Sequence, residues 1–380
     1  MRRAPGIQTQ SSDLALAATI VLVVAFLQAA HAQGLHEESL RIPMAGAGAR
    51  GLEAFMVRPD DEGAHPLALI THGTPREASA RGEIYALSFV PQAREFARRG
   101  WTAVIVVRRG YGTSGGAYAE DGRACSSHPD FYGSGKESAR DLRAAIGYLA
   151  GVAHVDASRV LSVGVSAGGF ANVALTADPP ANLIAAISFA GGRGSRRPDE
   201  VCNPEDLVRA FAEYGKTSRV PMLWIYAVND HFFGPQLAAN FYAAFSRSGG
   251  QATFIRAAAY RHDGHGLFSS GGIALWTPMV DSFLAAQHLQ LRSDLLPLPT
   301  PPDVPPPGAL PVEAQAEWRS FLTYPGHSAF AVSGGGHYAY TYGRPSDHEA
   351  RRAALEHCED VAPRGDRCEL VAITPDAAPK

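Results

Sequence analysis

Val160-Leu-Ser-Val-Gly-Val-Ser-Ala-Gly-Gly-Phe170 is a strand-like run that turns directly into a helix-like one. The aliphatic residues of 159–165 predict a strand, and the small and apolar residues of 167–176 predict a helix. The junction has the pattern G-x-S-x-G, in which a serine sits on a sharp turn with its hydroxyl raised above the sheet edge. An ordinary glycine-rich turn is the alternative, so the interpretation of Ser166 depends on the rest of the chain.

The residues on both sides alternate between strand and helix signals. Strands are expected at 67–70, 102–107, 159–165, 183–189, 222–228 and 253–257. Helices are expected at 91–99, 138–149, 167–176, 206–214, 236–246 and 277–289. Because the strands are continuous apolar runs, they suit a parallel sheet that is covered on both faces. The sequence therefore predicts an α/β fold.

An acid and a histidine follow the serine in the order that a catalytic triad can take in such folds. Asp230 comes just after the fifth expected strand, and His265 comes after the sixth. A serine hydroxyl needs a neutral imidazole to accept its proton, and a carboxylate to orient that imidazole. We therefore predict a triad of Ser166, His265 and Asp230. His262 is the competing base, and Asp263 is the weaker competing acid.

Two backbone amides are candidate donors to an oxyanion. Thr71-His-Gly-Thr74 ends the first expected strand, where a loop would present the amide of Thr74. The amide of Ala167, just past the serine, would be the second donor. A His-Gly pair after a strand is common, so this signal is weak by itself.

Taken together, these motifs resemble those of α/β-hydrolases. In chain order they are Thr71-His-Gly73, Arg109-Gly-Tyr-Gly-Thr-Ser-Gly115, Gly164-Val-Ser-Ala-Gly168, Asp230 and Asp263-Gly-His265. Within that fold, residues 38–292 look like the dienelactone hydrolase and prolyl-oligopeptidase-like group of serine hydrolases. The resemblance implies a mostly parallel eight-stranded sheet and hydrolysis of an acyl bond.

Two departures from that group bear on the substrate. Dienelactone hydrolases proper use a cysteine nucleophile, whereas this chain has Ser166, which favours esters over the lactone. No propeller domain precedes the motifs, which disfavours size-gated cleavage of oligopeptides. We expect a carboxylesterase acting on a small-molecule ester. A peptidase or amidase with the same triad, and a non-catalytic binding protein on a hydrolase scaffold, are the alternatives.

The composition excludes other classes of protein. The chain has 380 residues, with 34 Lys and Arg against 37 Asp and Glu, a formal charge of −3. This balance lacks the basic excess that nucleic-acid binding requires, and a hydrophobic fraction of 46% excludes disorder of the whole chain. Nothing indicates a cofactor or a metal. Zinc on His231, His262 and His265 is the chemical alternative, but there is no H-E-x-x-H and the spacing of these histidines fits no common zinc pattern.

The N-terminus has the features of a secretory signal peptide. Arg2 and Arg3 precede the apolar run 14–27, which is shorter than the about 20 residues that a membrane span needs. Ala30-His-Ala32 supplies a small-x-small cleavage pattern, so residues 1–32 are the expected signal peptide. An uncleaved anchor is the alternative. The mature protein is expected to be periplasmic or secreted, with no membrane span.

The four cysteines are expected to form disulfides after export. Cys358 and Cys368 lie ten residues apart, which favours a local bridge and leaves Cys125 for Cys202. Cys125 lies in the long loop 111–137 and Cys202 in the loop 190–205. Both loops would emerge beside Ser166, so a Cys125–Cys202 bridge would join the rim of the site.

A proline-rich segment divides the chain. Eight of the fifteen residues 297–311 are proline, which predicts an extended linker between a catalytic domain at 33–296 and a small domain at 312–380. The small domain is expected to be a ββαβ module, with strands at 329–333 and 337–342, a helix that starts after Ser346, and a strand at 368–373. Its aromatic residues form a core or a binding face, and its partner is not identified.

Two further sets of residues have two interpretations each. Phe232 and Phe233 follow the acid and either line an acyl pocket or pack under the acid loop. Arg76, Arg108 and Arg109 either bind an anionic group of the substrate or, as we favour, have structural or solvated roles.

Overall fold

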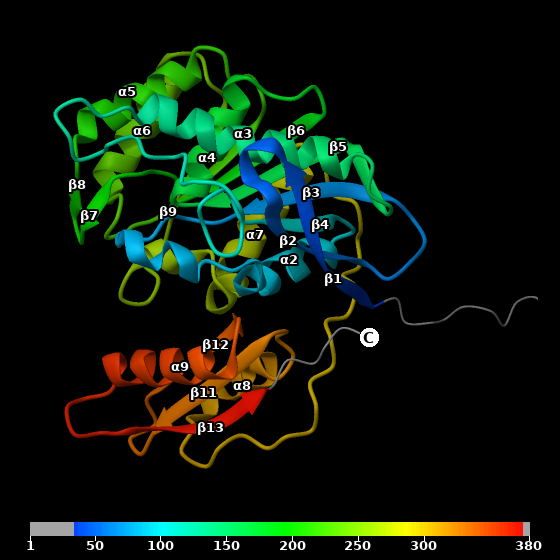
Figure 1. Ribbon diagram of the computed structural model, residues 1–380, viewed down its shortest axis with the longest axis vertical. Coiled ribbons are helices and arrows are strands. Elements are labelled where there is room, and N and C mark those ends of the chain that lie inside the picture. The colour runs from blue at the N-terminus through cyan, green and yellow to red at the C-terminus, as the bar shows by residue number, and fades with distance from the viewer. Residues whose placement is uncertain (1–33, 375–380) are drawn as a thin grey trace, which may run out of the picture. The chain divides into compact units, whose positions relative to one another are not determined.

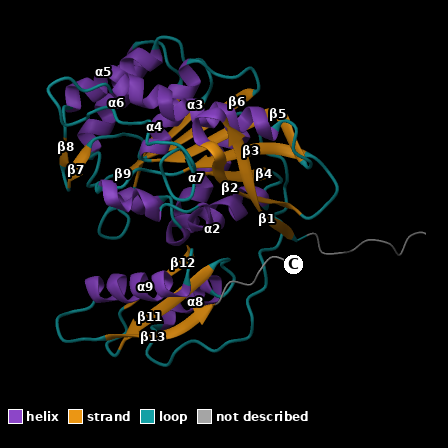
Figure 2. Cartoon of the chain, in the orientation of Figure 1, coloured by secondary structure: helices purple, strands orange, loops and turns teal. Residues whose placement is uncertain are grey.

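An eight-stranded sheet forms the core of the computed structural model, which describes residues 34–374 (Figures 1 and 2). The expected signal peptide lies outside the described residues. Along the sheet the strand order is β1-β2-β4-β3-β5-β6-β9-β10. The strands are β1 (Leu35–Met44), β2 (Gly48–Pro59), β3 (His65–Thr71), β4 (Thr102–Val106), β5 (Val155–Val165), β6 (Leu183–Phe189), β9 (Met222–Ala227) and β10 (Ala252–Ala257).

Six of these strands are parallel, as the continuous apolar runs predicted. Strands β4, β3, β5, β6, β9 and β10 pair in parallel, whereas β1 pairs antiparallel with β2, and β2 with β4. The α/β-hydrolase fold class is confirmed. The β1–β2 hairpin supplies the two strands of the sheet that were not predicted from the sequence. Since β5 is central, the serine at its end lies in the middle of the sheet edge.

Helices cover both faces of the sheet. On one face pack α3 (Phe131–Leu149), α4 (Ala167–Ala177), α5 (Pro204–Gly215) and α6 (Pro235–Arg247), with side chains in one core cluster. On the other face pack α2 (Val90–Ala97) and α7 (Ile273–Ala286), with side chains in a second cluster. Figure 1 shows the two layers on opposite sides of the strands. Apolar side chains are therefore buried on both faces, as a parallel sheet requires.

One helix begins seven residues earlier than predicted. Helix α3 starts at Phe131 rather than at Ser138, and the Asp130 side chain accepts a hydrogen bond from the amide of Gly133 at its first turn (2.6 Å). Gly133 and Gly135 have poor helix propensity, so the sequence does not predict a helix over these first residues of α3. A Cβ at Gly135 would collide with the hydroxyl of Tyr214, so close packing of α3 requires a glycine there.

The C-terminal segment contains a small antiparallel sheet. Residues 297–306 have no helix or strand. After them come α8 (Gln315–Phe321), β11 (His327–Ser333), β12 (Tyr338–Arg344), α9 (Asp347–Val361) and β13 (Cys368–Thr374), with sheet order β12-β11-β13. The expected ββαβ order is present. Trp318, which precedes the expected strands, lies in the short helix α8.

The aromatic residues of this segment pack together. Trp318, Phe321, Tyr324 and Phe330 are buried in one cluster, and the tyrosines of β12 pack against it. A core role therefore accounts for most of them. At the start of α9, the Ser346 hydroxyl accepts the amide of Glu349 (3.3 Å), as its capping-box sequence predicts.

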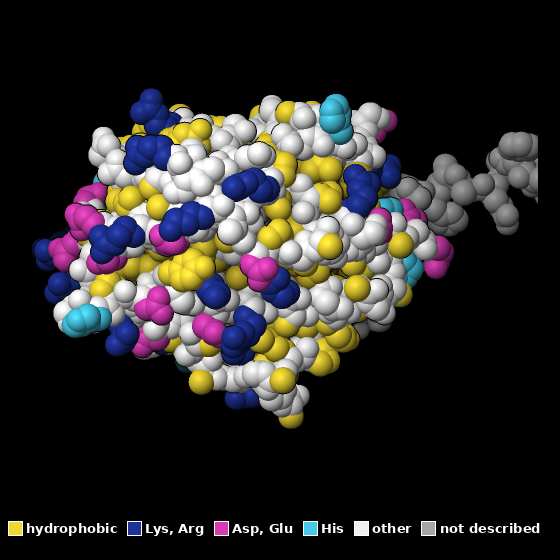
Figure 3. All heavy atoms as spheres, turned by 90° about the horizontal axis from the view of Figure 1, so that it is seen from above, with side chains coloured by type: hydrophobic (Ala, Val, Ile, Leu, Met, Phe, Trp, Pro, Cys, Tyr) yellow, Lys and Arg dark blue, Asp and Glu magenta, His cyan; other side chains and the backbone are white. Residues whose placement is uncertain are grey.

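The outer surface of the protein mixes charges of both signs. Figure 3 shows Lys and Arg side chains interspersed with Asp and Glu over the face that it displays. Within residues 34–374, no helix combines the length and apolarity needed to cross a membrane.

Candidate active site

Ser166 sits on a sharp turn between β5 and α4. Its backbone has φ 56° and ψ −121°, a left-handed conformation that is costly for a residue with a side chain. The flanking glycines are required by close packing, because a Cβ at Gly164 would collide with the carbonyl oxygen of Gly168. A Cβ at Gly168 would lie 2.5 Å from the carbonyl oxygen of His72. The turn therefore has the geometry of a nucleophile elbow.

Asp230 and His265 are paired. Nδ1 of His265 lies 3.2 Å and 3.1 Å from the two carboxylate oxygens of Asp230. Asp230 is 2% exposed and also accepts the backbone amides of Phe232 (2.7 Å) and Phe233 (2.9 Å). Burial raises the pKa of Asp230, but the hydrogen bonds from His265 and from the two amides lower it by a larger amount. The pKa of Asp230 is therefore below its ordinary value. The arrangement holds an ionised carboxylate against Nδ1 and leaves Nε2 as the free nitrogen.

The competing residues occupy other places. The side chain of Asp263 accepts the backbone amides of His231 (3.0 Å) and His265 (2.9 Å), so it shapes the histidine loop. His262 is exposed. His231 pairs with Asp199 at 2.9 Å. Within residues 34–374, no group of three or more His, Cys, Asp and Glu side chains is arranged to hold a metal ion.

The serine and the histidine are not hydrogen-bonded to each other. Nε2 of His265 is buried and has no hydrogen-bond partner among residues 34–374. The structure therefore joins two of the three predicted triad residues directly and places Ser166 at the elbow, without the serine–histidine bond.

His265 is held by aromatic rings. Phe232 stacks on the imidazole, and Phe233 packs at its edge with ring centroids 5.6 Å apart and planes at 64°. Both phenylalanines also line the cavity that contains Ser166. Both interpretations weighed for this pair therefore apply, since the rings support the acid loop and border the cavity.

The two predicted oxyanion donors lie in the same cavity. Thr74 and Ala167 line it together with Ser166, and neither backbone amide donates to another residue of 34–374. The loop before Thr74 is fixed by His72, which the sequence analysis did not single out. Nδ1 of His72 lies 2.6 Å from the carbonyl oxygen of Gly73, and Nε2 accepts the amide of Arg108 (3.0 Å). Burial, and then Arg108, lower the pKa of His72 well below its ordinary value, so it acts as a neutral clamp.

A buried charge network lies beneath this loop, and sequence reasoning missed it. Glu120 is bound by Arg108 and by Arg193, the latter at 2.6 Å. Arg108 also donates to Thr71 Oγ1 and to the carbonyl oxygen of His72, both at 2.7 Å. Burial raises the pKa of Glu120, but the two guanidinium groups lower it far more. The network ties the loops around the serine to one another.

Arg109 has a structural role as well. Its guanidinium donates to Asp141 (2.6 Å) and to Glu137 (3.1 Å). With Arg108 in the buried network, two of the three arginines weighed as anion ligands are paired with carboxylates. This is the outcome that the sequence analysis favoured for them.

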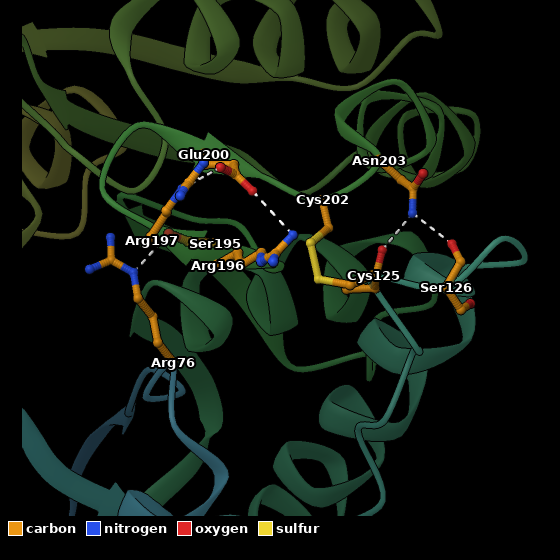
Figure 4. Close-up of a disulfide and its surroundings, with 10 residues drawn as sticks. Arg76, Cys125, Ser126, Ser195, Arg196, Arg197, Glu200, Cys202 and Asn203 are labelled. Atoms are coloured by element: carbon orange, nitrogen blue, oxygen red, sulfur yellow. Dashed lines mark hydrogen bonds and ion pairs between the residues drawn. A yellow bond between two sulfur atoms is a disulfide. The ribbon is translucent and has the colours of Figure 1, made fainter.

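The cavity beside Ser166 has a volume of about 570 Å³, and most of its lining comes from three segments. One segment follows β3, one is the loop after β4, and one is the loop after β6. Cys125 and Cys202 form a disulfide between the last two, with Cα atoms 4.9 Å apart. Asn203 adds hydrogen bonds to the carbonyl oxygens of Ala124 (2.7 Å) and Ser126 (2.8 Å), as Figure 4 shows for the rim. The second disulfide joins Cys358 at the end of α9 to Cys368 in β13.

Comparisons with known proteins agree with this fold. The sequence model of Peptidase S15, the X-Pro dipeptidyl-peptidase (S15) family, matches residues 48–198. No curated protein sequence matches the chain. A similar solved structure is described as a dienelactone hydrolase from Klebsiella pneumoniae subsp. pneumoniae MGH 78578, with 15% identity, TM-score 0.46, and coverage of 66% of this chain and 98% of that one.

Two further structures represent esterases and peptidases. A thermophilic esterase from Thermogutta terrifontis has 17% identity and TM-score 0.46, with coverage of 67% of this chain and 96% of that one. A puromycin-hydrolyzing peptidase from Mycobacterium tuberculosis has 19% identity and TM-score 0.48, with coverage of 69% and 40%. The chain has the α/β-hydrolase fold, a mostly parallel eight-stranded sheet with helices on both faces.

Proposed function

We propose that the chain is an exported serine hydrolase that cleaves carboxylic esters with Ser166, His265 and Asp230. The observation that carries this proposal is the Asp230–His265 pair, in which a buried carboxylate holds Nδ1 at 3.1 Å. Two further observations support the proposal. Ser166 has the backbone conformation of a nucleophile elbow, and it borders the same cavity as Phe232 and Phe233. The missing Ser166–His265 hydrogen bond would form on substrate binding, since catalytic hydrogen bonds tighten in the Michaelis complex.

The proposed reaction has two steps. In the first, Oγ of Ser166 attacks the acyl carbon while Nε2 of His265 takes its proton. The amides of Thr74 and Ala167 stabilise the oxyanion, and the alcohol leaves with the proton from His265. In the second, a water molecule gives its proton to His265 and attacks the acyl-enzyme. The carboxylic acid is then released and Ser166 is regenerated.

Amide cleavage is the second candidate function. The match to the X-Pro dipeptidyl-peptidase family favours it, because that family name denotes peptide substrates. Esters and amides need the same nucleophile, base and oxyanion donors, so the site geometry serves either. The serine in place of the cysteine of dienelactone hydrolases is our reason to place esters first.

The test is hydrolysis of matched substrates by the wild type and by Ser166→Ala. We expect para-nitrophenyl esters to be cleaved faster than the corresponding para-nitroanilides, with ester turnover lowered about 10⁴–10⁶-fold in Ser166→Ala. Ester turnover retained in a folded Ser166→Ala protein would refute the mechanism. Faster cleavage of the anilides would favour the peptidase reading.

Export and domain division are proposed on separate grounds. The apolar segment 14–27 with its cleavage pattern, and two disulfides, favour maturation in an oxidising compartment. We expect N-terminal sequencing of the protein secreted by its natural host to begin at Gln33. We also expect limited proteolysis to cut within 297–311, between a catalytic domain at 33–296 and a C-terminal module at 312–380.

A further inference from the structure

The cavity beside Ser166 is rich in arginine. Its lining includes five arginines and three carboxylates, and they come from the loops after β3, β4 and β6. The arginines are Arg76, Arg81, Arg123, Arg193 and Arg196, and the carboxylates are Glu77, Glu120 and Asp121. A cavity lined by an excess of one charge concentrates ligands of the opposite charge.

Three of these arginines have no carboxylate partner. Within residues 34–374, Arg76, Arg81 and Arg123 form no ion pair. Arg76 donates to the hydroxyl of Ser195 (3.1 Å) and to a backbone carbonyl (3.1 Å), both neutral groups. Arg81 lies over the ring of Tyr118 at 3.6 Å, a contact that leaves its charge uncompensated. The guanidinium groups of Arg81 and Arg123 are therefore available to bind an anion, whereas Arg76 also lies near the carboxylates of Asp263, Asp230 and Asp199.

The buried floor of the cavity adds to this charge. Arg108 and Arg193 share the single carboxylate of Glu120, which leaves one net positive charge in a buried network. Tyr111, which donates to Glu120 at 3.0 Å, does not neutralise it, because burial raises the pKa of its hydroxyl far above its ordinary value. The neutral His72 beside Arg108 adds no compensating charge.

The three lining carboxylates offset the five lining arginines only in part. Glu120 forms ion pairs with two arginines. Asp121 accepts a hydrogen bond from the backbone amide of Arg123 (3.0 Å), two residues later in the same loop. Glu77 is exposed to solvent. The loops after β4 and β6 are fixed to each other, because the Cys125–Cys202 bridge joins them and Arg196 pairs with Glu200 at 3.5 Å next to it (Figure 4).

We propose that the substrate of this site is an ester that carries a carboxylate group, bound by Arg81 and Arg123 while Ser166 attacks its acyl carbon. This inference rests on the proposed function and names its substrate class. A guanidinium matches a carboxylate with two parallel hydrogen bonds, which makes arginine the suitable partner. The opposite arrangement, a site for a substrate with a free ammonium group, is disfavoured by the same charges.

The test uses three para-nitrophenyl esters with acyl chains of matched length. They are the half-ester of adipic acid, which ends in a carboxylate, the hexanoate, which ends in a methyl group, and the ω-aminohexanoate, which ends in an ammonium group. We expect kcat/KM at low salt to be at least about 10-fold higher for the adipate than for the hexanoate, and lowest for the aminohexanoate. Added salt should reduce this preference by screening.

A second pair places the carboxylate on the leaving group. Nitrophenyl hexanoates with and without a ring carboxylate are compared in the same way. Preference for the anionic ester in either pair supports the proposal, and the pair that shows it identifies the side of the cavity that binds the charge. No preference in both pairs overturns the proposal.

Substitutions then assign the preference to the arginines. In the variants Arg81→Gln and Arg123→Gln, alone and combined, the ratio of kcat/KM for the anionic and neutral esters should fall about 10-fold or more in total. Arg81→Lys should keep part of the preference, because it keeps the charge. Arg351→Gln, at an exposed arginine of α9, is the control and should leave the ratio unchanged. A ratio unchanged in every cavity variant would overturn the assignment.

The outcomes separate this inference from the proposed function. Ser166-dependent cleavage of the neutral ester without any preference for the anionic one would refute only the inference. Absence of Ser166-dependent cleavage of all the esters would refute the proposed function itself.

Discussion

The ring of Phe232 lies parallel to the imidazole of His265, with centroids 3.8 Å apart and 11° between the planes. The guanidinium of Arg76 lies over the same phenyl ring at 3.5 Å. Arg76 is in turn held by the hydroxyl of Ser195 and the carbonyl oxygen of His231. His265 is therefore fixed at Nδ1 by Asp230 and at its ring face by Phe232.

Removal of the stacked ring should disorder the base. We expect Phe232→Ala to lower kcat on a neutral ester about 10-fold or more, because a small misplacement of a catalytic group has large effects. Phe232→Tyr keeps the ring and should restore most of kcat. Steady-state kinetics separates this role from simple substrate contact, since a pure contact role would raise KM and leave kcat unchanged.

Asp230→Asn should leave the fold intact and lower kcat about 10⁴-fold, because the carboxylate sets the tautomer of His265.

The lowered pKa of Asp230 also has a consequence for stability. The ionised group stabilises the folded state above its ordinary pKa of 3.8, and this contribution is lost as the pH falls through the lower folded value. Urea unfolding should therefore show a larger difference between wild type and Asp230→Asn at about pH 6 than at about pH 3. An equal difference in unfolding free energy at the two pH values would contradict the lowered pKa of Asp230.

The oxyanion loop requires a glycine beside the nucleophile. A Cβ at Gly73 would lie 2.9 Å from Cβ of Ser166, so Gly73→Ala should displace the serine and lower kcat about 100-fold. The matched control is Gly82→Ala, since a Cβ at Gly82 would meet no atom within 4 Å. Ester assays of the two purified variants provide the check, and equal activity would show that the loop is not set by this contact.

Loss of the buried carboxylate should destabilise the whole protein. In Glu120→Gln, Arg108 and Arg193 would keep their charges without a counter-ion, which costs about 3–5 kcal/mol of unfolding free energy. Glu77→Gln changes an exposed carboxylate of the same cavity and should change that free energy by less than about 0.5 kcal/mol. Urea denaturation followed by circular dichroism measures both, and similar midpoints for the two variants would contradict the network.

The parts of the fold that sequence predicted are those with strong local signals. The buried strands are continuous aliphatic runs, and the turn at Ser166 has glycines where backbones nearly touch. Strand β1 could not be predicted because it is mostly half-exposed and carries charged residues such as Glu37 and Arg41. The first turns of α3 were missed because packing against Tyr214, not propensity, selects Gly135.

The places of the candidate site residues in the fold could be predicted where chain order alone identifies a residue. Ser166, Asp230 and His265 each follow a strand of the sheet, so their approximate place could be read from the sequence. The network around Glu120 could not, because Arg193 lies 73 residues away and a single Glu or Arg carries no local pattern. The stack of Arg76, Phe232 and His265 likewise joins three separate loops. Only the tertiary structure shows which arginines remain unpaired in the cavity.

The most direct test of Ser166 as an activated nucleophile is covalent labelling. The oxidised, folded chain 33–380 is treated with a fluorophosphonate, and the adduct is located by mass spectrometry of its peptides. The account predicts a single phosphonyl adduct on Ser166, and loss of ester hydrolysis in proportion to labelling. Absence of an adduct in protein shown to be folded with both disulfides formed, or an adduct on another serine with Ser166 unmodified, would contradict it.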